Sequence, residues 1–253
     1  MKIRNLFSTM EALLISGAFI IGWSAAPAVA HELNHPNGNL KIRVEYRLAK
    51  DEILTNNNIS VAIGNKNIVL SGTVPTLFKK LEAGKLTREL ANGLTVTNDI
   101  AVSTPAVSDS VIDVKVMHRI ETQVPYTVFD WAQAQSKKGT VTLTGWVNNP
   151  QYIGLYARQA ERVVGVKKVV DRLQYVFQYR RLAWKAVRLI YLRGDLFPGV
   201  SLTFNPPVHV IAVDGMVILE GKMFSKPFAA DIANRVRFHT DAIRVYDEIR
   251  TPA

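Results

Sequence analysis

Apolar and polar positions alternate in three short stretches of this chain, and the stretches share one pattern. Each has apolar residues at its first, third and seventh places and glycine at its fifth. Alternation with a period of two indicates a half-buried β-strand. The glycines are 73 and 76 residues apart, which indicates an internal repeat. The three stretches are Ile68–Val74, Val141–Val147 and Val217–Met223.

The residues around each stretch repeat as well. Turn-forming residues precede it, and such residues tolerate the positive φ angles of a tight β-hairpin. The first strands predicted before these turns are Ile59–Ile63, Thr127–Ala132 and Val208–Val213. The last strands predicted to close the copies are Val96–Val102, Val166–Phe177 and Ala242–Ile249.

Helical segments flank the strands in each copy. In the second copy, apolar residues recur on one helical face, and Ser108 or Asp109 is a candidate N-cap. The helices predicted before the hairpins are Leu40–Leu54, Ser108–Thr122 and Arg180–Leu192. The helices predicted after the hairpins are Leu77–Ala91, Pro150–Val164 and Lys226–Phe238.

Each copy is therefore predicted to run helix–strand–strand–helix–strand. This order predicts an α+β fold of three tandem small αββαβ two-layer sandwiches. We place the three domains at residues 40–105, 108–178 and 180–250. Residues 103–107 are predicted to form a linker, whereas the junction at 178–181 is short, so we expect the second and third copies to touch.

The first thirty residues have the pattern of a signal peptide. Lys2 and Arg4 precede an apolar run from Ala12 to Trp23, and small residues follow up to Ala30. We predict a signal peptide over residues 1–30, cleaved after Ala30, and a periplasmic location with peripheral membrane association. The alternative is an uncleaved anchor.

Charge and cysteine content narrow the possible partners. The formal net charge is +10, and it remains +9 once residues 1–30 are removed. A basic protein favours acidic partners, and export makes nucleic acid an unsuitable one. The absence of cysteine excludes a disulfide framework, a thiol nucleophile and cysteine-ligated metal sites.

The repeated unit resembles the BON domain, named for bacterial osmotically inducible periplasmic protein Y and nodulation proteins. That family has a turn glycine, a V-x-L-x-G-x-V strand and a closing G-V-x-x-V-x-[ND]-x-[LI] segment. The second copy matches best, with Gly139, Val141–Val147 and Gly165–Leu173. The third copy has Asp241 in place of the closing glycine, and the first has Lys66 in place of the turn glycine.

The resemblance implies an exported, non-enzymatic envelope protein that binds phospholipid or another envelope component. It also implies a role in envelope integrity, osmotic stress or assistance to other envelope proteins. Three linked copies would give multivalent attachment if they face the same surface. We expect association with anionic phospholipid membranes; the alternative is a protein-binding or chaperone-like adaptor for envelope proteins.

The helix predicted to begin at Arg180 is the first candidate contact surface. A basic amphipathic helix with aromatic residues suits a lipid headgroup surface, although an ordinary core helix with a solvated basic face has the same pattern. Its predicted lipid-contacting residues are Arg180, Arg181, Trp184, Lys185, Arg188 and Tyr191, with Arg193 adding charge at its end.

The helix predicted at Pro150–Val164 is the second candidate. Tyr152 and Tyr156 share one face and Arg158 adds charge, so headgroup contact and aromatic packing on the sheet are both open. Trp146 marks either an exposed interaction patch or an interface between copies.

The sequence contains no recognisable catalytic signature. It has no G-x-S-x-G elbow, no H-E-x-x-H and no G-x-G-x-x-G. Cleavage would leave His31 at the N-terminus with His35 four residues later, which suits scavenged copper or nickel more than a specific site. The other histidines, His118, His209 and His239, lie in different copies and have no ligand-like spacing. We therefore expect no enzymatic activity, no small-molecule substrate, no cofactor and no metal.

Overall fold

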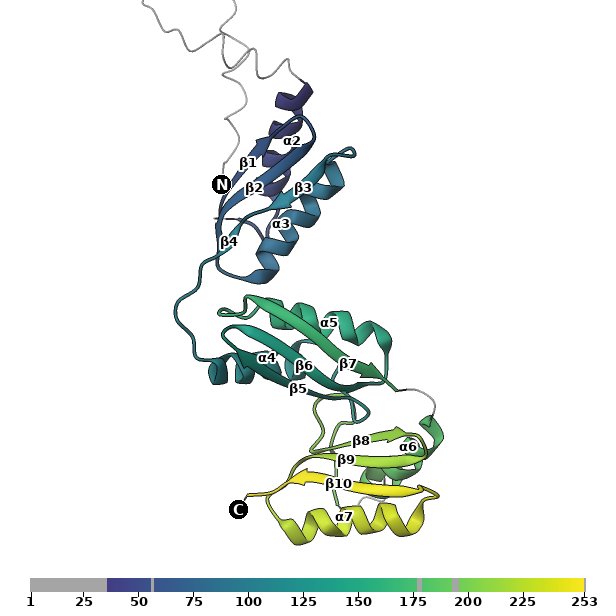
Figure 1. Ribbon diagram of the computed structural model, residues 1–253. Coiled ribbons are helices and arrows are strands. Elements are labelled where there is room, and N and C mark those ends of the chain that lie inside the picture. Colours follow the sequence, from purple (N-terminus) through teal and green to yellow (C-terminus); the bar gives the residue numbers. More distant parts are fainter. Residues whose placement is uncertain (1–35, 56, 177–178, 193–195, 253) are drawn as a thin grey trace, which may run out of the picture.

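The computed structural model describes residues 36–55, 57–176, 179–192 and 196–252 (Figure 1). The predicted signal peptide and Arg193 lie outside these residues. The described chain forms three units in succession, which we call unit 1 (36–102), unit 2 (109–175) and unit 3 (180–250). No helix within the described residues has the length and apolar character needed to cross a membrane.

The three units have the same order of elements. Unit 1 consists of α2 (Pro36–Lys50), β1 (Asn58–Ile63), β2 (Asn67–Val74), α3 (Leu77–Leu90), β3 (Thr95–Asn98) and β4 (Ala101–Val102). Unit 2 consists of α4 (Asp109–Gln123), β5 (Trp131–Lys137), β6 (Thr140–Val147), α5 (Pro150–Glu161) and β7 (Lys168–Tyr175). Unit 3 consists of α6 (Arg180–Val187), its π-helical continuation η1 (Arg188–Leu192), β8 (Val208–Val213), β9 (Met216–Lys222), α7 (Lys226–His239) and β10 (Arg244–Arg250).

The sheets of the units are built alike. The second strand is central, antiparallel to the first and parallel to the last. In each unit a central-strand residue pairs with the residue 28 positions later, as Asn67 does with Thr95, Thr140 with Lys168, and Met216 with Arg244. The predicted α+β fold of repeated small units is therefore confirmed.

The glycine at the fifth place of each repeated stretch has a steric reason. Gly72, Gly145 and Gly221 all have positive φ, a conformation that favours glycine. A Cβ atom at any of them would overlap a carbonyl oxygen of the adjacent first strand or the residue just before it. The carbonyls concerned belong to Asn58, Trp131 and Pro207. The recurrence of glycine thus follows from the close approach of two strands.

The hairpin turns differ between the units. Units 2 and 3 use the two-residue turns Lys138–Gly139 and Asp214–Gly215, in which both residues have positive φ. In unit 1, Lys66 stands where the others have glycine, and the Gly64 N–H donates to the carbonyl oxygen of Asn67 (2.8 Å) with no positive φ in the turn. The last strand of unit 1 is interrupted between β3 and β4, but its register is unchanged.

The first strand of unit 2 begins later than predicted. Instead of Thr127–Ala132, β5 covers Trp131–Lys137. Residues 127–130 form a turn, because the buried Asp130 carboxylate accepts hydrogen bonds from the backbone and side chain of both Thr127 and Asn148 (2.6–2.9 Å). The true strand was missed because its inward positions hold only alanine and serine, which give a weak apolar alternation.

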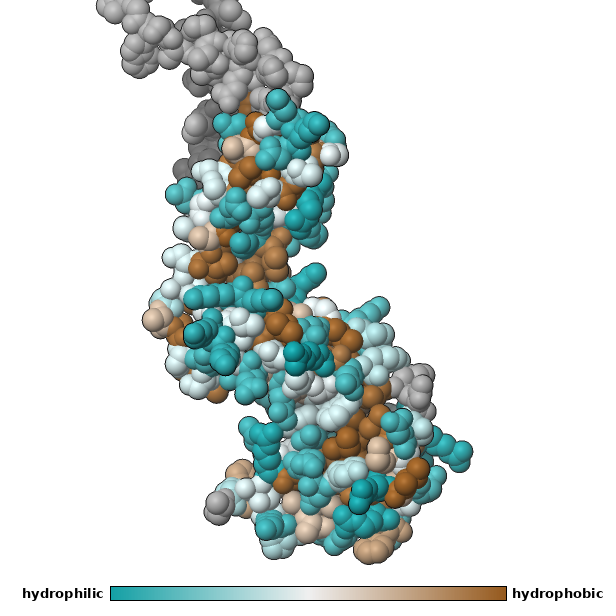
Figure 2. All heavy atoms as spheres, viewed as in Figure 1, coloured by the Kyte–Doolittle hydropathy of each residue, from teal (hydrophilic) through white to brown (hydrophobic). Residues whose placement is uncertain are grey.

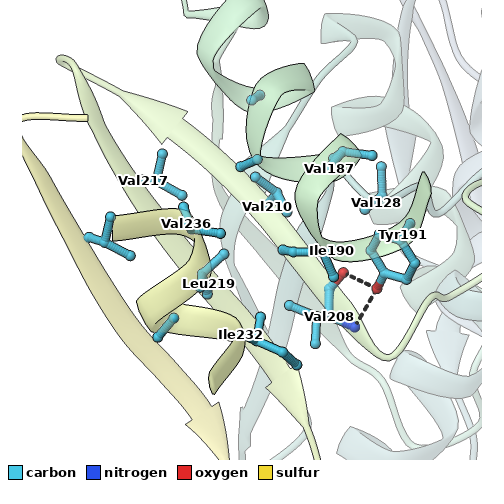
Figure 3. Close-up of a cluster of buried hydrophobic side chains, with 14 of the residues drawn as sticks. Val128, Val187, Ile190, Tyr191, Val208, Val210, Val217, Leu219, Ile232 and Val236 are labelled. Atoms are coloured by element: carbon cyan, nitrogen blue, oxygen red, sulfur yellow. Dashed lines mark hydrogen bonds between the residues drawn. The ribbon is translucent and has the colours of Figure 1, made fainter. Parts of the chain in front are cut away.

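Each unit has its own apolar core between its helices and one face of its sheet. Figure 3 shows the core of unit 3, where Leu219 of β9 packs against Ile232 and Val236 of α7 and Ile190 of η1. Val128 of unit 2 belongs to the same cluster. All of β8 up to Ala212 is buried, so unit 3 is covered on both faces along this strand.

Candidate functional site

A basic stripe runs along the exposed side of α6 and η1. Arg181, Lys185 and Arg188 are exposed and lie on one side of the helix, and Leu192 extends this stripe with 59% of its surface exposed. The opposite side of α6 is buried in the core of unit 3. The alternation of buried and exposed positions along the helix therefore orients the cations toward solvent.

A groove lies between this stripe and the C-terminal end of α7. It has a volume of about 580 Å³, and its lining residues are Lys185, Arg188, Leu189, Leu192 and His239. Two permanent cations and a histidine thus stand beside two leucine side chains. Such a mixture suits a group that is anionic at one end and apolar at the other.

One acidic side chain approaches the stripe. The Asp241 carboxylate lies 3.1 Å from Lys185 Nζ, and both side chains are exposed. The hydrogen bond from Lys185 lowers the pKa of Asp241, and the charge of Arg181 adds a smaller effect in the same direction. Asp241 therefore offsets part of the charge of Lys185, while Arg188 lines the groove beside it.

Apolar side chains project from the same end of unit 3. Phe238, at the end of α7, is 75% exposed, and Ile243, just before β10, is 81% exposed. Large apolar side chains with this exposure, next to a basic stripe, mark a surface that contacts something other than water. The sequence predicted the cations but missed the contributions of Leu192, His239, Phe238 and Ile243, which come from separate elements.

Three of the predicted residues of the helix take other positions. Tyr191 is buried, and its hydroxyl donates to the Val208 carbonyl (2.6 Å) and accepts from the Val208 N–H (2.9 Å), as Figure 3 shows. Burial raises the pKa of Tyr191. Trp184 is half-buried against the edge of Phe129, and Arg180 lines a cavity between units 2 and 3. The structure thus removes Tyr191 from any contact surface and separates Arg180 from the groove.

In α5, the second predicted contact helix, the two tyrosines pack inside unit 2. Tyr156 is fully buried and its hydroxyl donates to the Pro125 carbonyl (3.0 Å). Tyr152 is half-buried, with its ring stacked 6.1 Å from that of Tyr156. Arg158 is exposed on the same side of the helix as Gln151 and Gly154. The paired tyrosines correspond to the alternative of aromatic packing on the sheet.

Trp146 lies half-buried on the face of the unit 2 sheet that points away from the helices. It stands opposite Trp131 on the neighbouring strand.

Within the described part of the chain, no three histidine or acidic side chains gather in a way that could hold a metal ion.

A further basic surface in unit 1 was not anticipated from the sequence. The helix α2 exposes Arg43, Arg47 and Lys50 together with Tyr46, against the single exposed acid Glu45. The first helix of unit 2 has no such excess, since α4 carries the three acids Asp109, Asp113 and Glu121 against the two bases Lys115 and Arg119. Basic first helices are therefore a property of the two outer units.

Comparison with known proteins assigns units 1 and 2 to one family. The model of the BON domain matches residues 37–104 and 108–176, which together are more than half of the chain, and it does not match unit 3. Comparison with the curated proteins gave no match.

Two solved structures of CdsD, a structural protein of the type III secretion system of Chlamydia trachomatis, are weakly similar. The first, its C-terminal domain, is 12% identical over 83% of this chain and 96% of that chain, with a TM-score of 0.23. The second is 12% identical over 85% of this chain and 92% of that chain, with a TM-score of 0.24.

Proposed function

Because the chain belongs to the BON domain family, whose members are in general periplasmic or envelope-associated, we propose that it is an exported envelope protein that binds anionic phospholipid surfaces through unit 3. In this proposal residues 1–30 direct export and are then removed. The protein supports envelope integrity under stress and catalyses no reaction.

Unit 3 is, in this proposal, a third BON domain. Three observations support the assignment: the same element order, the same 28-residue register between its central and last strands, and Gly221 in the same steric position as Gly72 and Gly145. The family model was matched only by units 1 and 2. Divergence of unit 3 in sequence fits with its second, buried sheet face, which the other units do not need.

The observation that carries the lipid proposal is the joint exposure of cations and apolar side chains at one end of unit 3. Figure 1 places α7 at the end of the molecule away from unit 1, so a flat surface can approach it. Each basic residue near an anionic membrane contributes about 1 kcal/mol. Insertion of Leu192, Phe238 and Ile243 would add hydrophobic stabilisation in proportion to the apolar area removed from water.

The test is sedimentation of residues 31–253 with vesicles of phosphatidylglycerol or of phosphatidylcholine, at low and high salt. We expect binding to phosphatidylglycerol that weakens as salt rises. The variant Arg181→Glu/Arg188→Glu is expected to bind about 30-fold more weakly or worse, since two contributions of about 1 kcal/mol are lost. Lys185 is left intact because it is already paired with Asp241.

The matched control is Arg158→Glu/Arg172→Glu, which makes the same charge change at exposed positions of unit 2. Equal weakening in both double variants would show that net charge, and not this surface, governs binding. Absence of binding to any vesicle would overturn the proposal and favour the adaptor function.

A further inference from the structure

A second cavity lies between units 2 and 3, away from the basic stripe. It has a volume of about 350 Å³, within the range of sites for small molecules. Its walls come from α4 and β5 of unit 2 and from residues 205–207, β8, β9 and the end of β10 of unit 3. The cavity therefore exists only when the two units are docked.

Part of the wall is apolar and suited to the face of a ring. The Trp131 indole lines the cavity together with Met117, Pro206 and Pro207. The Trp131 ring is held in place, because its centre lies 5.2 Å from that of His209 and its Nε1–H donates to the Gln133 side-chain oxygen (3.2 Å) in the amide orientation that satisfies both groups. An aromatic ring that is already held in place can pack against a flat or cyclic group with little further loss of conformational entropy.

His209 contributes a buried ring to the wall of the same cavity. Its side chain is 1% exposed, and Nδ1 lies 3.0 Å from the carbonyl oxygen of Thr127. Because a carbonyl oxygen only accepts, Nδ1 donates its hydrogen to Thr127, and the ring also faces the backbone carbonyl of Asp130. Burial lowers the pKa of His209 to about 4, so the ring stays neutral at physiological pH. His209 is therefore a fixed, neutral ring in the cavity wall.

Two cations stand at the rim. Arg250 donates to the side-chain oxygen of Gln133 (3.0 Å), which ties the end of β10 to β5, and Lys222 lines the cavity beside it. A single acid, Glu121, also lines the wall; burial raises its pKa, and the charge of Lys222 acts in the opposite direction. The rim therefore has an excess of positive charge suited to one carboxylate.

From this arrangement we propose that the cavity between units 2 and 3 binds a small hydroxylated ring that bears a carboxylate, that is, a sugar acid. The ring would lie against Trp131, its hydroxyls would face the polar lining residues Gln133 and Asn205, and the carboxylate would pair with Arg250 and Lys222. Such a ligand would bridge the two units and stabilise their docked arrangement.

The test uses residues 31–253 and two pairs of probes that differ in the carboxylate. Glucuronic acid is compared with glucose, and N-acetylmuramic acid with N-acetylglucosamine, by calorimetry and by NMR of the Trp131 indole N–H. We expect the acids to bind and to shift this signal, and the neutral sugars to bind at least tenfold more weakly. Arg250→Gln is expected to weaken binding of the acids about tenfold or more.

Arg244→Gln is the matched control, since Arg244 is exposed at the opposite end of the same strand. Its affinity for the acids should equal that of the natural protein, and thermal unfolding of both variants shows whether they remain folded. The proposal is overturned if no probe shifts the Trp131 signal at millimolar concentration. It is equally overturned if neutral and acidic sugars bind alike, or if both arginine variants weaken binding equally. None of these readouts depends on vesicle binding.

Discussion

The two junctions between the units differ in kind. Units 1 and 2 meet through side chains: the guanidinium carbon of Arg162 on α5 lies 3.6 Å from the centre of the Phe78 ring on α3, and Leu77 joins the apolar cluster of unit 2. Residues 103–107 connect the units without helix or strand. On the face seen in Figure 2, apolar side chains gather where these units meet.

Units 2 and 3 share backbone hydrogen bonds as well as a core. The Val128 N–H donates to the Leu202 carbonyl (2.8 Å), and the Val128 carbonyl accepts from the Val210 N–H (2.7 Å). The Asn205 N–H donates to the Tyr126 carbonyl (2.9 Å). The Val128 side chain lies in the core of unit 3. The segment before β5 therefore belongs structurally to both units.

This difference predicts how each junction behaves when the protein unfolds. Contacts between side chains can separate while both partners stay folded, as in ordinary interfaces between domains. Shared core residues and shared backbone hydrogen bonds cannot be lost without exposing apolar surface and buried polar groups. We therefore expect units 2 and 3 to unfold as one cooperative body and unit 1 to unfold separately.

The largest effect is expected from Val128→Asp. This change places an unpaired carboxylate in the core of unit 3, and we expect a loss of about 4 kcal/mol or more from the free energy of unfolding. Denaturant unfolding should show units 2 and 3 losing stability together. Val114→Asp, at a position 70% exposed in unit 2, is the control and should change stability by less than about 0.5 kcal/mol.

Glu220 distinguishes unit 3 from the other units, because the equivalent sheet position is exposed in units 1 and 2. Ser71 and Thr144 occupy the equivalent place and face solvent, whereas Glu220 is only 7% exposed. Burial raises the pKa of Glu220 to about 7, and Glu248 adds to this while Arg250 opposes it. A raised carboxyl pKa means that the folded state holds the proton more tightly, so stability falls as pH rises from about 4.5 to about 7.

Glu220→Gln is expected to remove this dependence on pH. Near pH 5 the variant and the natural protein should be similar, and at pH 8 the variant should be more stable by about 2 kcal/mol. Denaturant unfolding at the two pH values measures the difference. Thr144→Glu, the reciprocal change at the exposed site in unit 2, should cause no loss of stability as pH rises. A difference between Glu220→Gln and the natural protein that stays constant with pH would contradict the assignment.

The smallest change in stability is expected from Arg162→Gln at the first junction. It removes the cation–π contact with Phe78, worth about 1 kcal/mol, and leaves the cores intact. Unit 1 should then move more independently, seen as lower transverse NMR relaxation rates in residues 36–102, while the unfolding of units 2 and 3 is unchanged. Arg158→Gln, exposed on the same helix, should have neither effect. A common loss of stability in all three units would show that the first junction is also cooperative.

Much of the architecture could be predicted because it depends on local and repeated features. The alternating stretches, the turn glycines and the recurring order of elements led to three αββαβ units before any contact was known. Two predictions are wrong because of tertiary packing, one between units and one within unit 3. Thr127–Ala132 is predicted as a strand because Val128 is apolar, but the Val128 side chain lies in the core of unit 3. Tyr191 is predicted at the surface, but its buried hydroxyl forms hydrogen bonds with both the carbonyl and the N–H of Val208.

The sequence by itself determined the repeat, the strand positions of two units, the essential glycines and the cations of α6. These follow from periodicity and steric limits that act within a few residues or between adjacent strands. Only the tertiary structure decided which tyrosines are buried, that His239 joins Lys185 and Arg188 in one groove, and that Trp131, His209 and Arg250 line one cavity. The reason is physical: burial and the meeting of distant residues depend on how whole units pack, and that packing has no period along the chain.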